Sequence, residues 1–469
     1  MITFNNTKTI YDLVKNVGQE YENKVFVRFE KDDTIFEKGY GTFTMDTMAI
    51  AAYIHEQNEK FGHSVHAAIL GNCSYEYLTV LLGVPSGAGV SVPLDIKLSA
   101  EKMARNLKKA DIDILFFDRE FSSQAELLKE LCPFIKRFIC LQSRKNVRCV
   151  PMLHKVFRGQ DFKKSVKPAD CAMIIFTSGT TGEGKGVMLS HGNIIDNMFC
   201  TDDSEEVCLN VLPIHHVFCI SGDVFLVLRY GSTLCLCDDT SRMLYYIKLF
   251  QPTVMRVVPM IAKMLVNRIA ILQKKTNRSL ADIKNEVVGK RLNRLVSGGG
   301  YLSESLSESL LELGIVTGQG YGMSECSPKI SVPDYERKDK VASVGHLVTG
   351  CQVRIVDGEI QVKSPSVMMG YYHDEELTRE AITEDGWLRT GDMGYVDEED
   401  FVYLNGRKKN LIILSNGENV SPEMIENCFD GDRLVADILV YGKGEIIAAE
   451  IYPNFEYAQA HDIQDIEAA

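Results

Sequence analysis

The sequence lacks features that define several whole classes of protein. It has no run approaching the ~20 apolar residues of a membrane helix, and its start, MITFNNTKTIYDL, has neither the basic residues nor the apolar core of a signal peptide. Its 13 cysteines include no C-x-x-C pair, so we expect reduced thiols rather than a zinc ribbon or a disulfide framework. Basic residues are also too few for a nucleic-acid-binding protein, because 51 Lys+Arg and 64 Asp+Glu give a net charge of −13. We therefore expect a cytoplasmic protein with no integral membrane segment and no nucleic-acid partner, whose oligomeric state stays open.

The sequence does contain an alternation of strand and helix patterns. Residues 65–93 predict a buried strand (HAAILGN), an amphipathic helix (CSYEYLTVLLGVPSGA) and a second strand closed by Pro93. Residues 111–141 repeat this order. After about Gly345 the pattern changes to short strands and turns, with an Asp-Gly hairpin signal in CQVRIVDGEIQVKS. We predict an α/β fold, with a large N-terminal domain of layered, largely parallel α/β sheets and a β-rich subdomain.

Domain boundaries follow from the same patterns. The charged run GRKK at 406–409 precedes a new apolar segment, LIIL, and marks the main boundary. We predict a large N-terminal domain over 1–407, including a β-rich subdomain over about 345–407, and a small α+β C-terminal domain over 408–469.

The sharpest local signal is a glycine-rich segment, IIFTSGTTGEGKG, at 174–186. Backbone N–H groups, hydroxyls and a lysine gathered at the end of a strand are suited to phosphate oxygens, whereas the alternative is a flexible surface turn. A Walker loop would end in serine or threonine and open a helix, but here the last position is Gly186 and the strand-like GVMLS follows. The helix begins only near Ser190. The segment therefore joins strand to strand, which argues against a P-loop NTPase.

The segment TSGTTGEGKGVMLSHGNI resembles the phosphate loop of the adenylate-forming superfamily, which includes acyl-CoA synthetases, peptide-synthetase adenylation domains and firefly luciferase. Five further segments follow in that family's order: LPIHHVF (212–218), RLVSGGG (294–300), GQGYGMSECSP (318–328), GWLRTGD (386–392) and LNGRKKNLIILSNGENVSPEMIE (404–426). The resemblance covers nearly the whole chain and is strongest to fatty acyl-CoA synthetases. It implies that 1–407 is an N-terminal adenylation domain and that 408–469 is a partial C-terminal domain.

The resemblance implies ATP and Mg²⁺ as ligands and coenzyme A as co-substrate. It assigns catalytic roles to Thr177, Lys185, His216 and Glu325, the last also as the magnesium ligand. It implies that the nucleotide is bound by Thr177, Ser178, Gly179, Thr180, Thr181, Gly182, Lys185, Gly298, Gly299, Gly300, Gly320, Tyr321, Gly322, Met323, Ser324, Asp392 and Arg407. Among these, Tyr321 would stack on adenine and Asp392 would accept both ribose hydroxyls. The acyl pocket would be lined by His216, Val258, Pro259, Gly298 and Gly300.

The C-terminal region departs from the family pattern. Members normally carry a catalytic lysine near the end of a longer C-terminal domain, whereas the last lysine here is Lys443, in an unlike setting. We therefore expect that this chain lacks that lysine and that its adenylation is impaired. The resemblance places a hinge at Lys409, about which the small domain would rotate between two half-reactions.

The implied function is ATP-dependent activation of a carboxylic acid, a medium- or long-chain fatty acid, through an acyl-adenylate and then transfer to coenzyme A. An acyl-carrier-protein synthetase and an aryl- or amino-acid-adenylating enzyme are alternatives. Asp223 could correspond to the aspartate that binds the substrate ammonium in amino-acid-activating members, but we interpret it as a helix residue. Luciferase-like oxidation is a further alternative, because luciferases share every one of these motifs. A non-catalytic acyl-adenylate binder is the alternative from a different class, favoured by the short C-terminus.

Overall fold

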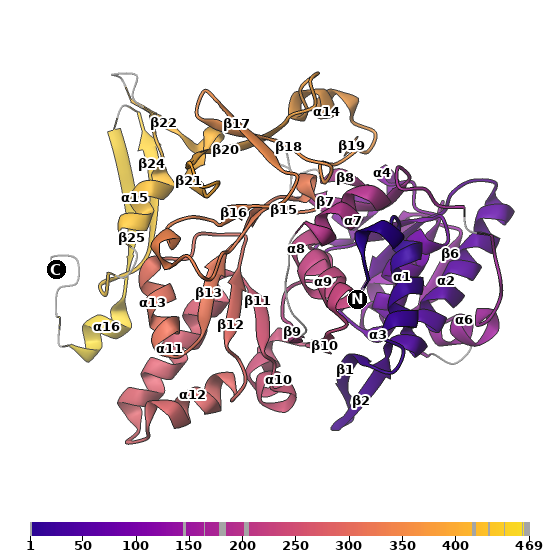
Figure 1. The fold of residues 1–469 in the computed structure, drawn as a ribbon, viewed down its shortest axis with the longest axis horizontal. Helices are drawn as coiled ribbons and strands as arrows, with labels where there is room; N and C mark the ends of the chain where they lie inside the picture. Colours follow the sequence, from indigo (N-terminus) through magenta and orange to yellow (C-terminus); the bar gives the residue numbers. More distant parts are fainter. Residues whose placement is uncertain are drawn as a thin grey trace.

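Two seven-stranded sheets form the centre of the molecule, for which a computed structural model describes residues 2–143, 147–163, 165–177, 184–200, 206–414, 419–429, 432–444, 446–461 and 463 (Figure 1). The sheet that we call the N-terminal sheet has the order β19 (Gly370–Tyr371), β8 (Lys185–Ser190), β7 (Cys171–Thr177), β4 (Val90–Pro93), β3 (His66–Leu70), β5 (Ile114–Phe117) and β6 (Arg137–Cys140). The sheet that we call the middle sheet has the order β13 (Val316–Gln319), β12 (Arg294–Ser297), β11 (Val254–Val257), β9 (Val207–Asn210), β10 (Thr233–Leu236), β1 (Val25–Lys31) and β2 (Thr34–Gly39). Among the described strands of these two sheets, only β2 and β8 run against the common direction, so the largely parallel α/β prediction is confirmed.

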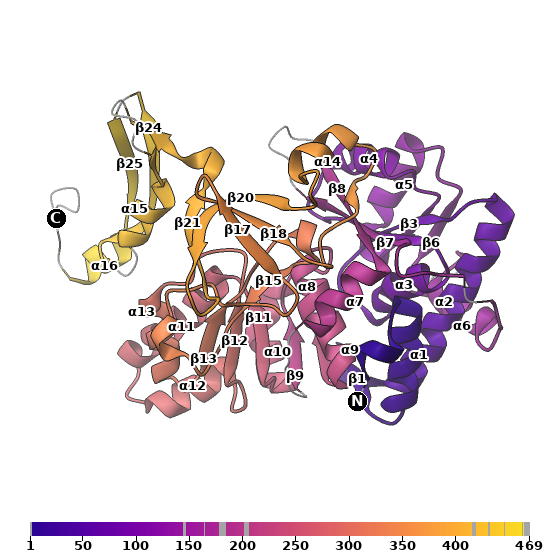
Figure 2. The ribbon, with the colours of Figure 1, turned by 45° about the horizontal axis from the view of Figure 1, so that its top comes forward.

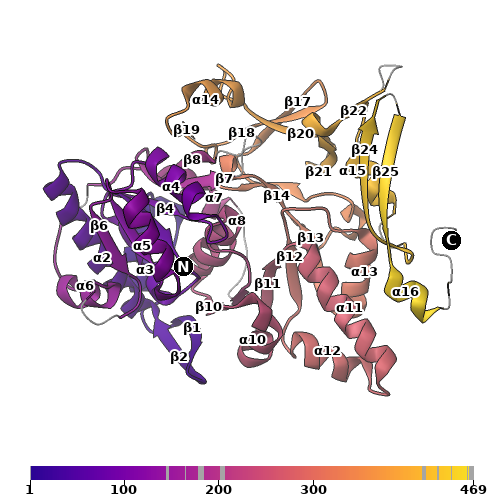
Figure 3. The same cartoon turned by 180° about the vertical axis from the view of Figure 1, so that it is seen from behind.

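Helices cover both faces of each sheet, because consecutive strand residues point to opposite sides and both sides are apolar. Val254 of β11 faces the core shared with the N-terminal sheet, whereas its neighbour Met255 packs with Leu265 on the other face. The shared core is completed by α1 (Ile10–Glu20), α2 (Tyr40–Phe61), α3 (Tyr75–Ser86), α6 (Val150–Phe157), α7 (His191–Phe199), α8 (Val217–Cys219), the π-helical η3 (Ile220–Phe225) and α9 (Leu226–Tyr230). The outer faces carry α4 (Ala100–Lys109) and α5 (Ser122–Leu131) on the N-terminal sheet, and α10 (Met243–Phe250), α11 (Pro259–Lys275), α12 (Leu280–Val288) and α13 (Glu304–Glu312) on the middle sheet (Figure 3).

Helix α3 corrects one local prediction. It was expected to be amphipathic, but every residue of it except Glu76 is buried. The helix lies between β3 and β4 of the N-terminal sheet and the helices α1 and α2, so it has no solvent face. A helix that is apolar all round is typical of such a central position.

The β-rich part crosses between the two large sheets and the C-terminal elements (Figure 2). Its four-stranded sheet has the order β17 (Gln352–Val356), β18 (Glu359–Lys363), β20 (Leu388–Val396) and β21 (Val402–Arg407), accompanied by α14 (Glu375–Ala381). A three-stranded sheet, β14 (Tyr321–Gly322), β15 (Lys329–Val332) and β16 (His346–Leu347), lies nearer the middle sheet. The predicted hairpin is present, and its turn residues Asp357 and Gly358 both have positive φ values, 52° and 77°. Such angles are those of a type I′ turn, which favours Asp-Gly.

The C-terminal elements lie at the end of the molecule opposite the N-terminal helices (Figure 1). After the 3-10 turn η7 (Lys408–Asn410) come β22 (Ile412–Ile413), β23 (Asn419–Val420), α15 (Pro422–Cys428), β24 (Val435–Lys443), β25 (Ile446–Pro453) and α16 (Phe455–Ala460). The strand expected at LIIL is only the two-residue β22. The domain boundaries and the hinge at Lys409 stay predictions. Across the described ranges, no helix has both the length and the apolar character to cross a membrane.

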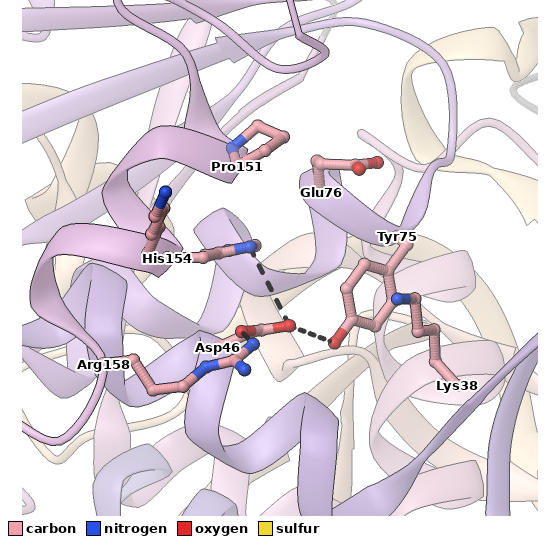
Figure 4. A pocket seen from close by; sticks show the side chains of 8 residues that line it. Lys38, Asp46, Tyr75, Glu76, Pro151, His154 and Arg158 are labelled. Carbon is pink, nitrogen blue, oxygen red and sulfur yellow. Dashed lines mark hydrogen bonds and ion pairs between the residues drawn. The ribbon is translucent and has the colours of Figure 1, made fainter.

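A polar cleft of about 360 Å³ lies on the N-terminal half, where α2, α3 and α6 meet (Figure 4). Its centre is Asp46, whose carboxylate accepts the Tyr75 hydroxyl at 2.8 Å and pairs with Arg158. His154 Nε2 lies 3.1 Å from the Thr79 hydroxyl, and its Nδ1 is 3.8 Å from Asp46 Oδ2. Burial, only partly opposed by Asp46, lowers the pKa of His154 to about 4.

This histidine should make the stability of the fold depend on pH. In the unfolded chain the pKa of His154 is about 6.5. Below that pH the His154 ring is therefore protonated in the unfolded state but stays neutral in the folded state until the pH approaches 4. Stability should therefore fall as pH drops from about 6.5 towards 4, with a contribution of about 2 kcal/mol between pH 7 and 5. Urea unfolding at both pH values should show that His154→Gln loses less stability than wild type, whereas His346→Gln, at an exposed histidine, should follow wild type. Equal losses for the wild type and His154→Gln would contradict the assignment.

Candidate functional site

The glycine-rich segment connects two antiparallel neighbours, β7 and β8, as predicted. Thr177 ends β7 and is the register partner of Lys185, which begins β8, and both are half-buried. The helix α7 starts after Ser190, which caps it by accepting the Asn193 N–H at 3.0 Å. The predicted phosphate-binding residues Ser178, Gly179, Thr180, Thr181 and Gly182 lie outside the described residues.

A tyrosine that sequence reasoning missed connects Lys185 with Glu325. Tyr371 lies on β19, next to β8, and the Lys185 ammonium is 5.6 Å from the centre of its ring. The Tyr371 hydroxyl donates to Glu325 Oε1 at 2.7 Å. Burial and the charge of Glu325 raise the pKa of Tyr371, so it stays a donor. Two predicted catalytic residues are thus held together by a contact across strands that no local motif reveals.

The acidic residues suit a magnesium ion that arrives with the nucleotide. Over the described residues, no group of three or more His, Cys, Asp or Glu side chains could hold a metal ion. Glu325 is a single carboxylate, 8% exposed, in the 3-10 turn Ser324–Cys326. Mg²⁺ commonly takes one or two carboxylates and completes its octahedron with phosphates and water. Glu325 therefore fits the predicted role of metal ligand, with the other ligands supplied by the substrate.

A second polar group surrounds Asp392 on β20. Its Oδ2 accepts the Tyr321 hydroxyl at 2.6 Å, and its Oδ1 lies 2.8 Å from Arg407 Nε, its partner across β20 and β21. Burial raises the pKa of Asp392, while these two partners oppose the shift. The carboxylate is thereby oriented by both residues, and its remaining lone pairs suit hydroxyl donors. The stacking of Tyr321 on adenine stays a prediction.

One cavity of about 1100 Å³ joins predicted nucleotide and acyl residues. Its lining includes nine of them: His216, Val258, Gly298, Gly299, Gly320, Tyr321, Gly322, Met323 and Ser324. Gly298 must be small, because a Cβ there would lie 3.0 Å from the Phe218 ring. Pro259 and Gly300 do not line this cavity, and a Cβ on Gly300 would lie 3.4 Å from Pro259.

The histidine and the aspartate of the predicted acyl region have different surroundings. His216 precedes α8 at the cavity wall, and burial lowers the pKa of its ring, so it is neutral at pH 7. Asp223 lies within η3, as the helix interpretation predicted, and is fully buried beside Arg256 and Asn210.

Near the C-terminus, Lys409 lies in η7 and Lys443 is exposed at the end of β24. The impaired adenylation expected from the setting of Lys443 stays a prediction.

Comparisons with known proteins define the class. Residues 14–372 match the family described as AMP-binding enzyme, and the chain belongs to this adenylate-forming family. The 2-succinylbenzoate–CoA ligase of Bacillus cereus is 31% identical over 404 residues, which cover 81% of this chain and 75% of that ligase. The long-chain-fatty-acid–CoA ligase ACSBG2 of Mus musculus is 28% identical over 428 residues, covering 76% of this chain and 64% of the mouse protein.

Solved structures show the same fold. An anthranilate CoA ligase, AuaEII, in complex with anthranoyl-AMP has a TM-score of 0.82 at 17% identity, over 96% of this chain and 88% of that one. The O-succinylbenzoate coenzyme A synthetase of Bacillus subtilis, in complex with ATP and magnesium, has a TM-score of 0.76 at 23% identity, over 96% and 92%.

Replacement of Asp392 by asparagine should weaken nucleotide binding. The carboxylate is the acceptor proposed for the ribose hydroxyls, and each hydrogen bond to a charged group contributes about 1.5–3 kcal/mol. We expect the KM for ATP to rise about 10- to 100-fold in initial-rate assays, with a smaller change in kcat. Tyr321→Phe keeps the ring and the Asp392 charge, so its effect on KM should be well below that of Asp392→Asn. An unchanged KM in Asp392→Asn would contradict the ribose assignment.

Proposed function

We propose that this chain activates a carboxylic acid with ATP and then transfers the acyl group to the thiol of coenzyme A. In the first step the carboxylate oxygen attacks the α-phosphorus of ATP, and pyrophosphate leaves. In the second step the thiolate attacks the acyl carbon, and AMP leaves. The single observation that carries the proposal is the cavity in which Tyr321 and Gly322 share one space with His216 and Val258. The ligase names of the relatives support the same reaction.

Several predicted site residues, most of them outside the lining of this cavity, fit the demands of the first step. Phosphoryl transfer needs charge neutralisation and in-line positioning more than covalent help. Lys185 and Thr177 lie at the ends of the strands that lead into the glycine-rich loop, where they would contact phosphate oxygens. Magnesium bound at Glu325 would neutralise charge on the phosphates. Asp392, oriented by Tyr321 and Arg407, would hold the ribose.

The acid is proposed to have a largely apolar body, and a medium- or long-chain fatty acid is the form predicted from the sequence. Apolar side chains make up much of the cavity wall, including Val217, Leu226, Met260, Ile261 and Met264. A volume of about 1100 Å³ lies just above the ~300–1000 Å³ that is usual for ligand sites and leaves room for both nucleotide and acyl group.

Product analysis tests the reaction. The protein is incubated with ATP, Mg²⁺, coenzyme A and one acid at a time, and nucleotides and thioesters are separated by chromatography. We expect AMP and acyl-CoA in equal amounts, both dependent on the acid. Calorimetry with acyl-sulfamoyl-adenosines of short, medium and long chain then measures the preferred length without turnover. ADP as the product, or binding of no analogue, would overturn the proposal.

A further inference from the structure

The polar cleft between α2, α3 and α6 is separate from the cavity proposed for the nucleotide and the acid. Its lining residues are Lys38, Asp46, Tyr75, Glu76, Pro151, His154, Lys155 and Arg158, and none of them lines that cavity. The floor of the cleft is buried, because Asp46, Tyr75 and His154 are 3%, 4% and 7% exposed. Its volume of about 360 Å³ is near the lower end of the ~300–1000 Å³ that is usual for ligand sites. The cleft can therefore hold a small molecule.

The hydrogen bonds around His154 determine which of its ring nitrogens carries the hydrogen. The Thr79 hydroxyl donates its only hydrogen to the Glu76 carbonyl oxygen at 2.8 Å. It must therefore accept a hydrogen bond from His154 Nε2, which lies 3.1 Å away. Burial lowers the pKa of His154 to about 4, so at pH 7 the ring is neutral and its single hydrogen is on Nε2. His154 Nδ1 is consequently an acceptor.

This acceptor faces a second acceptor across the floor of the cleft. The carboxylate oxygen Asp46 Oδ2 lies 3.8 Å from His154 Nδ1, and Figure 4 shows the two side chains pointing toward one another. Oδ2 already accepts the Tyr75 hydroxyl at 2.8 Å, and Oδ1 accepts from Arg158. No donor among the residues that the structure describes contacts His154 Nδ1. An acceptor without a donor in a buried place is costly, so the floor lacks an N–H or O–H group between Asp46 and His154.

Positive charge is gathered at the rim of the cleft. Lys38, Lys155 and Arg158 contribute three cations, and the Lys38 ammonium lies 5.3 Å from the centre of the Tyr75 ring, beside the floor. Arg158 is ion-paired at the floor, but neither Lys38 nor Lys155 forms an ion pair within the described ranges. Burial raises the pKa of Glu76, and the charge of Lys38 partly opposes that shift. The rim can therefore accept a further negative charge.

An organic ammonium fits the floor better than a metal ion. In the part of the chain that the structure describes, no group of three or more His, Cys, Asp or Glu side chains could hold a metal ion, and Arg158 already lies against the Asp46 carboxylate. An ammonium has several N–H donors, so one group can donate to both Asp46 and His154, and the carboxylate favours its charge. A ligand that was only a cation would be repelled by the cations of the rim. The ligand therefore needs an anionic end as well.

We propose that the polar cleft binds a small zwitterion of the amino-acid class, with its ammonium between Asp46 and His154 and its carboxylate at Lys38 and Lys155. The ammonium supplies the donor that the buried floor lacks, and the carboxylate gives the two lysines an acidic partner. This ligand is distinct from the acid that is activated, because the cleft and the cavity share no lining residue.

Titration calorimetry at pH 7 tests the inference. The twenty protein amino acids, β-alanine and γ-aminobutyrate are titrated into the protein one at a time, and at least one of them should bind saturably. Two derivatives of that compound are then compared with it. The N-acetyl derivative lacks the ammonium and the amide lacks the carboxylate, so each should bind at least about 10-fold more weakly.

Two variants locate the two ends of the ligand. Asp46→Asn removes the negative charge and brings an N–H that can itself donate to His154 Nδ1. It should weaken binding of the amino acid at least about 10-fold and reduce its advantage over the N-acetyl derivative to less than about 3-fold. Lys38→Gln combined with Lys155→Gln should reduce the advantage over the amide in the same way. Lys129→Gln, at an exposed lysine of α5, should bind like wild type.

The lysine variant keeps the test decisive if Asp46→Asn does not fold, because it changes only the rim of the cleft. Thermal unfolding and circular dichroism establish that each variant is folded. Absence of saturable binding by every compound would overturn the inference, and a water molecule would then be the donor on the floor. Equal affinities of wild type and the lysine variant would also overturn it, because the amino acid would then bind elsewhere. Neither result bears on the proposed function.

Discussion

Replacing Lys185 with methionine should lower the rate of adenylate formation about 100- to 1000-fold. The ammonium would contact phosphate oxygens whose charge increases as pyrophosphate leaves, and the loss of one preorganised donor to such a charge typically costs that factor. Methionine keeps an unbranched apolar stem and lacks only the ammonium that lies over the Tyr371 ring, so the strand pairing of β8 should persist. Acid-dependent exchange of labelled pyrophosphate into ATP measures this step alone.

The second half-reaction is the internal control for this variant. Pyrophosphate has left before the thiol attacks, so transfer from a synthetic acyl-adenylate to coenzyme A should fall much less, by less than about 10-fold, since one hydrogen bond to the remaining phosphate is affected. Lys129→Met, at an exposed lysine of α5, should match wild type in both steps. Equal losses in both half-reactions of Lys185→Met would indicate a structural role for the lysine and contradict the phosphate assignment.

The sequence predicted those parts of the molecule that depend on neighbouring residues. The direct connection of strand β7 to strand β8, the Asp-Gly hairpin and the helix start at Ser190 each depend on a short segment of sequence, and each prediction is confirmed. The prediction for α3 was wrong about its surface. A short apolar helix has the same local sequence pattern whether one or all of its faces are buried. Here the packing of α1 and α2 against α3 determines that no face of α3 is left exposed to solvent.

Contacts between distant segments could not be predicted from the local patterns of the sequence. Tyr371 and Glu325 are 46 residues apart and meet because β19 pairs with β8. The pair Arg256 and Asp223 is separated by 33 residues and requires the middle sheet to face the π-helical η3. An arginine inside an apolar strand, MRVVP, was the available signal, since a buried charge needs a partner.

Replacing Glu325 with glutamine should lower adenylation about 100-fold and raise the Mg²⁺ concentration needed for half-maximal rate. The amide oxygen can still accept a hydrogen bond from the Tyr371 hydroxyl, which in the wild type lies 2.7 Å from Oε1, so the fold around the 3-10 turn Ser324–Cys326 should be kept. The negative charge, however, is lost, and an amide is a weaker ligand for a hard cation. Pyrophosphate exchange measured over a range of Mg²⁺ at fixed ATP gives both quantities.

Tyr371→Phe is the matched variant for Glu325→Gln, because it removes the hydrogen bond and leaves the carboxylate charged. If Glu325 acts as the metal ligand, Tyr371→Phe should lose less than about 10-fold, as expected for one hydrogen bond to a charged group, with little change in the Mg²⁺ requirement. If Glu325 serves mainly to anchor Tyr371 over Lys185, the order of the two variants should reverse. A normal Mg²⁺ requirement in Glu325→Gln would contradict the metal role, whatever the loss of rate, because charge at this carboxylate is the property that a divalent ion needs.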